Sequence, residues 1–264
     1  MTDYFSRIWR LRYFWMALVR NDLRNRYRRS VIGIGWSLLQ PIAMTIVLCA
    51  IFCQLFALSV RDYAPILLSG LTFWGFITTV VMQGCHCFFQ GESYIRQHPA
   101  PLAIYPLRTT LGAGFHFLLG FGITAAFVWW VNGFGNPLAL VSLVPTFVLP
   151  FVVGWSLAVC MGVVNVMFQD AQHIIEVAMQ IVFYLTPIMY PPQMLLDRLA
   201  KSHREWLVNL NPFAVLLELI RKPLLDGEFP SPTLTAIGGA IGLAAVGVAA
   251  LALLRFEKRL IFYL

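Results

Sequence analysis

The feature that most limits the fold of this chain is a series of long apolar segments separated by shorter polar ones. A helix needs about 20 mostly apolar residues to cross the hydrocarbon core of a bilayer. Six segments of the 264-residue chain meet or approach this length, and only 12% of its residues are charged. A soluble core could not bury so much apolar surface. We therefore expect an all-α integral membrane protein with six transmembrane helices. The expected spans are Ile34–Leu58, Ile66–Phe89, Leu107–Val131, Leu138–Met167, Ile174–Tyr190 and Leu234–Phe256.

These spans form one domain, 1–264, in which three regions differ. Residues 1–30 combine arginines with apolar residues at helical spacing, which predicts an amphipathic helix lying in the membrane interface. Residues 34–256 hold the six spans. Within them, residues 190–232 contain short apolar pieces that are too charged to cross a membrane, at Gln193–Leu199 and Phe213–Leu225. We expect these to be re-entrant or interfacial helices on the external face, between spans five and six.

The basic residues predict the orientation of the spans. Eight of the 19 Lys and Arg residues precede Ser30, and three more lie in the tail after Leu254. With the N-terminus in the cytoplasm, the cytoplasmic side carries 13 of them and the external side six. This asymmetry places both termini in the cytoplasm. The start of the chain lacks the pattern of a cleavable signal peptide. No recognition module accompanies the net charge of +7, so we expect no nucleic-acid partner.

The chain offers little for metal binding or catalysis. All five cysteines lie in apolar stretches, which favours buried free thiols over disulfides. Cys85-His86-Cys87 has no second pair of ligands at zinc-like spacing, so no metal site is expected. We also find no cluster of acidic residues and histidines that would form a catalytic site.

Three sequence blocks resemble a known family. They are Arg26–Pro41, then Asn165–Asp170 with Thr186–Pro191, then Asn209–Phe213 followed by Arg221 and Gly227. Their order, the chain length and the number of spans are similar to the membrane subunit of ABC-2 type polysaccharide exporters, which move O-antigen, teichoic acid or capsule chains. One departure is Gln169, where the family often has arginine.

The resemblance implies partners and a substrate. It implies a homodimer of this chain with two copies of a separate ATP-binding subunit in the bacterial inner membrane, exporting a lipid-linked glycan. The chain has no glycine-rich phosphate-binding loop, so ATP and Mg²⁺ are expected on the partner and no cofactor on this chain. We therefore expect a permease subunit and not an enzyme.

The polar loop between spans two and three is the candidate for coupling to the ATPase. Glu92, Tyr94, Ile95 and Arg96 fit one short amphipathic helix, of the kind that docks on the ATPase in such exporters. The alternative is an ordinary solvated loop. Asp170 is either a further coupling contact or a helix cap.

Two further groups of residues follow from the exporter interpretation. Aromatic rings stack on the apolar faces of sugars, so we expect about a third of the candidate aromatic residues to face a channel, and the rest to form the interfacial belt or core. These candidates are Trp36, Phe73, Trp74, Phe76, Phe183 and Tyr184. Prolines near the external end of span five weaken that helix, which suggests an external gate. The gate candidates are Pro187, Tyr190, Pro191 and Pro192.

Polar and small residues inside the third span are interpreted structurally. We expect His116 to be a packed, hydrogen-bonded side chain. Four glycines, Gly112, Gly114, Gly120 and Gly122, are expected to permit close helix packing. Two other functions stay open from the sequence: a membrane-embedded transferase acting on polyprenyl-linked sugars, and an ABC-2 exporter of small molecules or lipids.

Overall fold

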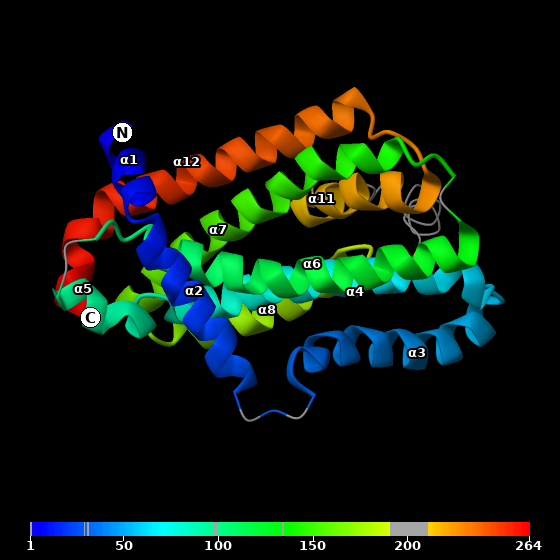
Figure 1. Cartoon of the computed structure of the whole chain (residues 1–264), viewed down its shortest axis with the longest axis horizontal. Coiled ribbons are helices and arrows are strands. Elements are labelled where there is room, and N and C mark those ends of the chain that lie inside the picture. Colours follow the sequence, from blue (N-terminus) through cyan, green and yellow to red (C-terminus); the bar gives the residue numbers. More distant parts are fainter. Residues whose placement is uncertain (1, 29, 31, 98–99, 134, 191–210) are drawn as a thin grey trace.

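The computed structural model describes residues 2–28, 30, 32–97, 100–133, 135–190 and 211–264 (Figure 1). Within these ranges the regular structure is entirely helical. Five helices are long and apolar enough to cross a membrane. They are α3 (Trp36–Phe56), α4 (Val60–His86), α6 (Ile104–Asn132), α7 (Leu143–Met167) and α12 (Pro232–Tyr263). The shorter helices are α1 (Thr2–Arg10), α2 (Arg12–Tyr27), α5 (Glu92–Gln97), α8 (Ala171–Leu185) and α11 (Pro212–Arg221). Single helical turns occur at Gly33–Gly35, Phe89–Gly91, Ala139–Ser142 and Lys222–Asp226.

The fifth expected span differs from the prediction. Its helix, α8, has 15 residues, which at 1.5 Å per residue is about 22 Å, short of the ~30 Å hydrocarbon core. It ends at Leu185 because Thr186 precedes a proline and adopts the extended backbone that such a position favours. The described chain therefore has five helices of spanning length where the sequence predicted six.

Two other helix boundaries differ from expectation. Helix α4 begins at Val60 because Ser59 caps it, its Oγ accepting a hydrogen bond from the Asp62 amide. Helix α12 begins after Ser231, whose Oγ accepts from the Leu234 amide at 3.2 Å, and it continues to Tyr263. The last span thus runs beyond Phe256 into the basic tail without interruption.

The long helices run side by side, with α4 at the centre (Figure 1). Helix α4 packs against α3, α6 and α7, and α12 packs on the outer side of α7. One end of the bundle holds α5 and the C-terminus, and the opposite end holds the connection between α3 and α4 (Figure 1). The core is rich in phenylalanine: the rings of Phe76 and Phe117 lie 4.9 Å apart, and those of Phe121 and Phe147 lie 4.6 Å apart.

At the crossing of α4 and α7 the two backbones come very close. A Cβ atom on Gly84 would lie 2.7 Å from the Cα of Ala158, and one on Gly162 would lie 2.9 Å from the Gly84 oxygen. Asn165 closes this crossing, because its Nδ2 donates a hydrogen bond of 2.9 Å to the Cys85 oxygen. Small residues let helix backbones approach closely where water does not drive association.

The glycines of the third span, now α6, fall into two groups. Gly114 packs against the ring of Phe151, and a Cβ on Gly120 would lie 2.9 Å from Thr72. These two fulfil the predicted packing role. Gly112 and Gly122 have open space where a Cβ would be, so the prediction fails for them.

The N-terminal segment is two helices tied to the bundle. Asp22 of α2 forms a bidentate ion pair with Arg108 of α6. Tyr4 of α1 donates to Glu257 of α12 at 3.1 Å and accepts from the Ala103 amide at 3.4 Å. Burial and the nearby Glu257 carboxylate raise the pKa of the Tyr4 hydroxyl, so this donor keeps its proton. The predicted interfacial helix is thus anchored to three other segments.

Enlarging Gly84 tests the close helix crossing. The Cβ of a Gly84→Ala variant would overlap backbone atoms of α7, which we expect to lower the free energy of unfolding by about 1–3 kcal/mol. Thermal unfolding in detergent measures this. Gly112→Ala, where there is room, is the matched control and should leave the melting temperature unchanged or higher. Equal destabilisation by both variants would contradict the tight crossing.

Candidate functional site

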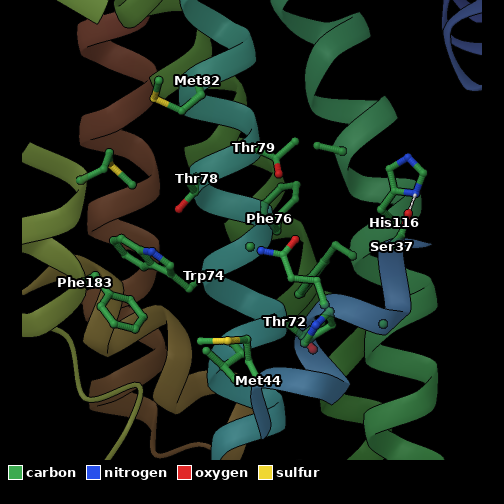
Figure 2. A pocket seen from close by; sticks show the side chains of 18 of the residues that line it. Ser37, Met44, Thr72, Trp74, Phe76, Thr78, Thr79, Met82, His116 and Phe183 are labelled. Atoms are coloured by element: carbon green, nitrogen blue, oxygen red, sulfur yellow. Dashed lines mark hydrogen bonds between the residues drawn. The ribbon is translucent and has the colours of Figure 1, made fainter. Parts of the chain in front are cut away.

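A cavity of about 550 Å³ lies between α3, α4, α6 and α8, with α2 at one end (Figure 2). Its walls combine aromatic, hydroxyl and amide groups. Aromatic and thioether side chains on its walls include Met44, Trp74, Phe76, Met82, Phe117, Met179 and Phe183. Polar side chains on its walls are Arg26, Ser37, Gln40, Thr72, Thr78, Thr79, His116, Glu176 and Gln180.

Trp74 and Phe183 form the aromatic part of the cavity (Figure 2). Their ring centroids lie 5.8 Å apart, and Phe213 of α11 supports Trp74 edge-on at the same separation. On the other side, Phe76 is held by Phe117. These neighbours leave each ring few rotamers, so the aromatic surface is fixed in place before any ligand arrives.

The polar part of the cavity contains hydroxyl groups without partners. The Oγ1 atoms of Thr72 and Thr78 are buried, and neither makes a hydrogen bond within the described residues. Most buried polar atoms in proteins are hydrogen-bonded. Two exceptions on one cavity wall, both on α4, indicate a surface that is completed by a ligand or by water.

A hydrogen-bonded junction closes one end of the cavity. The hydroxyl of Tyr27 lies 2.7 Å from Ser37 Oγ and 2.9 Å from His116 Nδ1, and Ser37 Oγ lies 3.2 Å from the same nitrogen. Tyr27 and Ser37 belong to the first sequence block, which turns at Gly33 with a positive φ of 55°. The junction joins α2, α3 and α6, and it confirms that His116 is a hydrogen-bonded interior side chain.

A second hollow of about 610 Å³ adjoins this junction and shares three residues with the first: Arg26, Ser37 and Gln40. It lies where α2 leads into α3, and Ser30 and Trp36 are among its other lining residues. Arg26 is exposed and forms no ion pair within the described chain. The two hollows therefore adjoin, and Arg26 lines both.

The predicted path residues separate into three groups. Trp74, Phe76 and Phe183 line the main cavity, and Trp36 lines the adjoining hollow. Phe73 is completely buried in the core, and it does not line the cavity. Tyr184 is 67% exposed on α8 and is also absent from the cavity wall.

The predicted coupling helix exists as α5, and its two faces differ. Ile95 is buried and Tyr94 packs edge-on against Phe14 of α2, with ring centroids 5.8 Å apart. These two side chains hold α5 on the protein. Ser93, Arg96 and Gln97 are exposed, and Glu92 forms an ion pair of 2.8 Å with Arg96. The face available to a partner is thus the Arg96 face, while Tyr94 serves attachment.

Asp170 lies in the exposed turn between α7 and α8. It occupies the N-cap position of α8, yet its side chain makes no capping hydrogen bond. Of the two roles predicted for Asp170, the cap is therefore not present. Its place at the α5 end of the bundle leaves it accessible (Figure 1).

Beyond α8, the chain turns through buried surroundings at Thr186–Ile188 and is held by Arg221 of α11. Its Nη1 donates to the Pro187 oxygen at 2.6 Å, and its Nη2 donates to the oxygens of Ile188 and Ile66 at 3.0 and 2.7 Å. Its Nε donates to Ser69 Oγ at 3.2 Å. Gly70 makes room for this arginine, since a Cβ there would lie 2.6 Å from Nη2.

Two more side chains complete the same segment. Asn211 Nδ2 donates to Thr186 Oγ1 at 2.9 Å and to the Leu185 oxygen at 3.3 Å, and Tyr63 donates to the Met189 oxygen. The second and third sequence blocks therefore interlock here. Sequence reasoning counted Arg221 as an external loop charge. Its position at the end of an apolar helical run, Ala214–Ile220, was the sequence feature that could have indicated a buried arginine.

The predicted gate is only partly described. Pro187 is buried with its oxygen bound by Arg221, and the Tyr190 hydroxyl donates to the Tyr184 oxygen at 3.0 Å. Pro191, Pro192 and the predicted helix Gln193–Leu199 lie outside the described residues. The predicted helix Phe213–Leu225 occurs as α11 continued by a π turn at Lys222–Asp226, packed on α4, α7 and α12.

No metal-binding group is evident in the described ranges: nowhere do three His, Cys, Asp or Glu side chains gather. All five cysteines are free thiols and four are buried. Cys85 Sγ donates to the Val81 oxygen of its own helix at 3.3 Å.

Comparison with known proteins gives one family and several relatives. Residues 13–225 match the family described as ABC-2 type transporter. The O-antigen export system permease protein RfbA of Klebsiella pneumoniae is 24% identical over 213 residues, 80% of each chain. The Myxococcus xanthus protein of the same name is 24% identical over 220 residues, 81% of each chain. The polysialic acid transport protein KpsM of Escherichia coli is 21% identical over 218 residues, 80% of this chain and 81% of that protein.

Replacing Arg221 tests the role of its hydrogen bonds. Arg221→Met removes every donor and leaves buried carbonyl oxygens unsatisfied, so we expect a loss of about 3 kcal/mol or more in the free energy of unfolding. Thermal unfolding in detergent provides the measurement. Lys222→Met removes the same charge from the next residue, which makes no comparable set of bonds, and should change stability by less than about 1 kcal/mol. Similar losses in both variants would contradict the assignment.

Proposed function

The chain belongs to the ABC-2 type transporter family, and we propose that it is the membrane-spanning subunit of an ATP-driven exporter of lipid-linked polysaccharide. The substrate would move from the cytoplasmic to the periplasmic side of the bacterial inner membrane. The relatives named for O-antigen export and polysialic acid transport support a glycan as the cargo. The family supports a transport role over the transferase that the sequence left open.

The observation that carries this proposal is the lining of the cavity. A sugar presents flat C–H faces and a rim of hydroxyl groups. Trp74 and Phe183 offer rings for the faces, and Thr72, Thr78 and Gln180 offer neutral hydrogen-bonding groups for the rim. A path for a repeating polymer must bind each unit weakly enough to release it, and a few rings and hydroxyls suit that need.

The hollow that Arg26 lines beside the cavity supports a lipid-linked cargo. Arg26, Ser30 and Trp36 line the hollow beside the start of α3, next to the basic N-terminal segment. A guanidinium pairs well with phosphate oxygens, and an indole suits the membrane interface. These groups fit the diphosphate end of a polyprenyl-linked glycan.

The membrane topology that we propose has six crossings with both termini in the cytoplasm. Helix α8 would cross together with the non-helical segment Thr186–Tyr190, whose backbone oxygens already accept hydrogen bonds from protein side chains. Irregular backbone is tolerated at membrane depth when it is buried in protein in this way. The 13 to six distribution of Lys and Arg supports the orientation. Residues 190–232 would then lie at the external face.

The assembly that we propose is a homodimer with two ATP-binding subunits, which hold the ATP and Mg²⁺. The exposed apolar faces of α3 and α8 suit lipid or a second copy of the chain. The Arg96 face of α5, with Asp170 nearby in the α7–α8 turn, would receive the ATPase. An exposed, ion-pairing arginine on a helix that is anchored by Tyr94 and Ile95 suits a docking contact.

Purification with a candidate ATP-binding subunit tests the function. We expect a stable complex whose ATPase activity in lipid nanodiscs depends on the permease, and Arg96→Gln should lower that activity at least tenfold. Glu92→Gln is the matched control, because it breaks the same ion pair but keeps the exposed guanidinium, so its activity should stay within about twofold.

Two outcomes would overturn the proposal. One is a wild-type chain that forms no complex with the ATP-binding subunit and modifies a polyprenyl-linked sugar by itself, as a transferase would. The other is a complex whose ATPase activity responds to small molecules or lipids and not to a lipid-linked glycan.

A further inference from the structure

Charge is scarce in the main cavity. Among its described lining residues, only Arg26 and Glu176 carry formal charges, and they have opposite signs. Both are exposed, Arg26 at the end of α2 and Glu176 in the second turn of α8. His116, the remaining titratable group on the wall, is already engaged by Tyr27 and Ser37.

The interior of the cavity offers neutral partners only. Thr72 and Thr78 present buried hydroxyl oxygens that lack a partner in the described chain, and Thr79 lies beside them on α4 (Figure 2). Nearer the mouth, the exposed residues Gln40 and Gln180 add amide groups from α3 and α8. A hydroxyl or an amide can both donate and accept, which matches the hydroxyls of a sugar.

A carboxylate in the same place would lack a counterion. Moving a charge from water into a helix bundle within a membrane is unfavourable unless the charge is paired. A polyanionic glycan brings such a charge with every repeat. The single Arg26 lies at the mouth and is offset by Glu176, so successive carboxylates would pass Trp74 and Phe183 unpaired.

We propose that this cavity selects a neutral, hydroxyl-rich glycan and rejects a polyanionic one. This inference rests on the proposed function and deepens it, since family membership leaves the charge of the glycan open. The specificity-determining residues are Thr72 and Thr78, which would bond the sugar hydroxyls, and Gln180, which places a neutral amide on the α8 wall one turn after Glu176.

The test measures binding of two oligosaccharides of equal length to the permease–ATPase complex in nanodiscs of zwitterionic lipid. The neutral probe is maltoheptaose and the acidic probe is a heptamer of sialic acid, each followed by equilibrium dialysis. We expect maltoheptaose to bind at least tenfold more tightly. Equal binding, tighter binding of the acidic probe, or no binding of maltoheptaose to an intact complex would overturn the inference.

Variants assign the preference to the cavity. Thr72→Val with Thr78→Val removes the unpaired hydroxyls while keeping side-chain shape, so maltoheptaose binding should fall at least tenfold with an unchanged or higher melting temperature. A lower melting temperature with unchanged binding would instead make these threonines structural. Gln180→Lys should improve binding of the acidic probe at least tenfold, whereas Gln180→Glu, the matched control, should not.

The experiments distinguish a failure of the exporter function from a failure of the charge selectivity. If the chain forms no complex with the ATP-binding subunit, the exporter function itself is wrong. If the complex forms and the Arg96→Gln variant behaves as expected while both glycans bind alike, only the charge selectivity is wrong.

Discussion

In the apolar interior of a membrane, a backbone carbonyl has no water to bond with, so every break in a helix needs donors from the protein. Helix α8 breaks at Leu185, and Arg221, Asn211 and Tyr63 supply the missing donors. Their side chains come from α11 and α4, so those helices must lie beside the broken segment. The position of α8, and with it one wall of the cavity, depends on this set of bonds.

The cavity exists because the helices of the bundle pack unequally. On one side, Gly84, Ala158 and Gly162 bring α4 and α7 into backbone contact. On the opposite side, the cavity lies between α4 and α8, and its walls carry Trp74 of α4 and Phe183 of α8. Much of α3 and α8 is exposed and apolar, and this surface suits lipid or another copy of the chain. A closely packed α4–α7 pair with more exposed helices α3 and α8 beside it suits a proposed transporter, in which a path for the substrate must open.

The sequence predicted the positions of the helices well, but it did not predict which face of each helix meets its neighbours. Hydropathy found every long span, and the polar loop between the second and third spans does form α5. Phe73 and Trp74 show what was missed: adjacent on α4, they point about 100° apart, and only Trp74 reaches the cavity. Apolar residues surround a membrane helix on all sides, so periodicity gives little sign of which face meets a neighbour. For the same reason the sequence could not show that Gly114 packs against a neighbouring helix whereas Gly112 does not.

The sequence by itself determined the membrane class, the helical fold, the approximate positions of the long helices and the uneven distribution of basic residues. These properties are local, since hydrophobic length and flanking charge act within one segment. Only the tertiary structure decided that Arg221 serves the end of α8, that Tyr27 and Ser37 meet His116, and which side chains line the cavity. Arg221 bonds residues that lie 34, 152 and 155 positions away, and such pairings depend on how the helices pack rather than on any one of them.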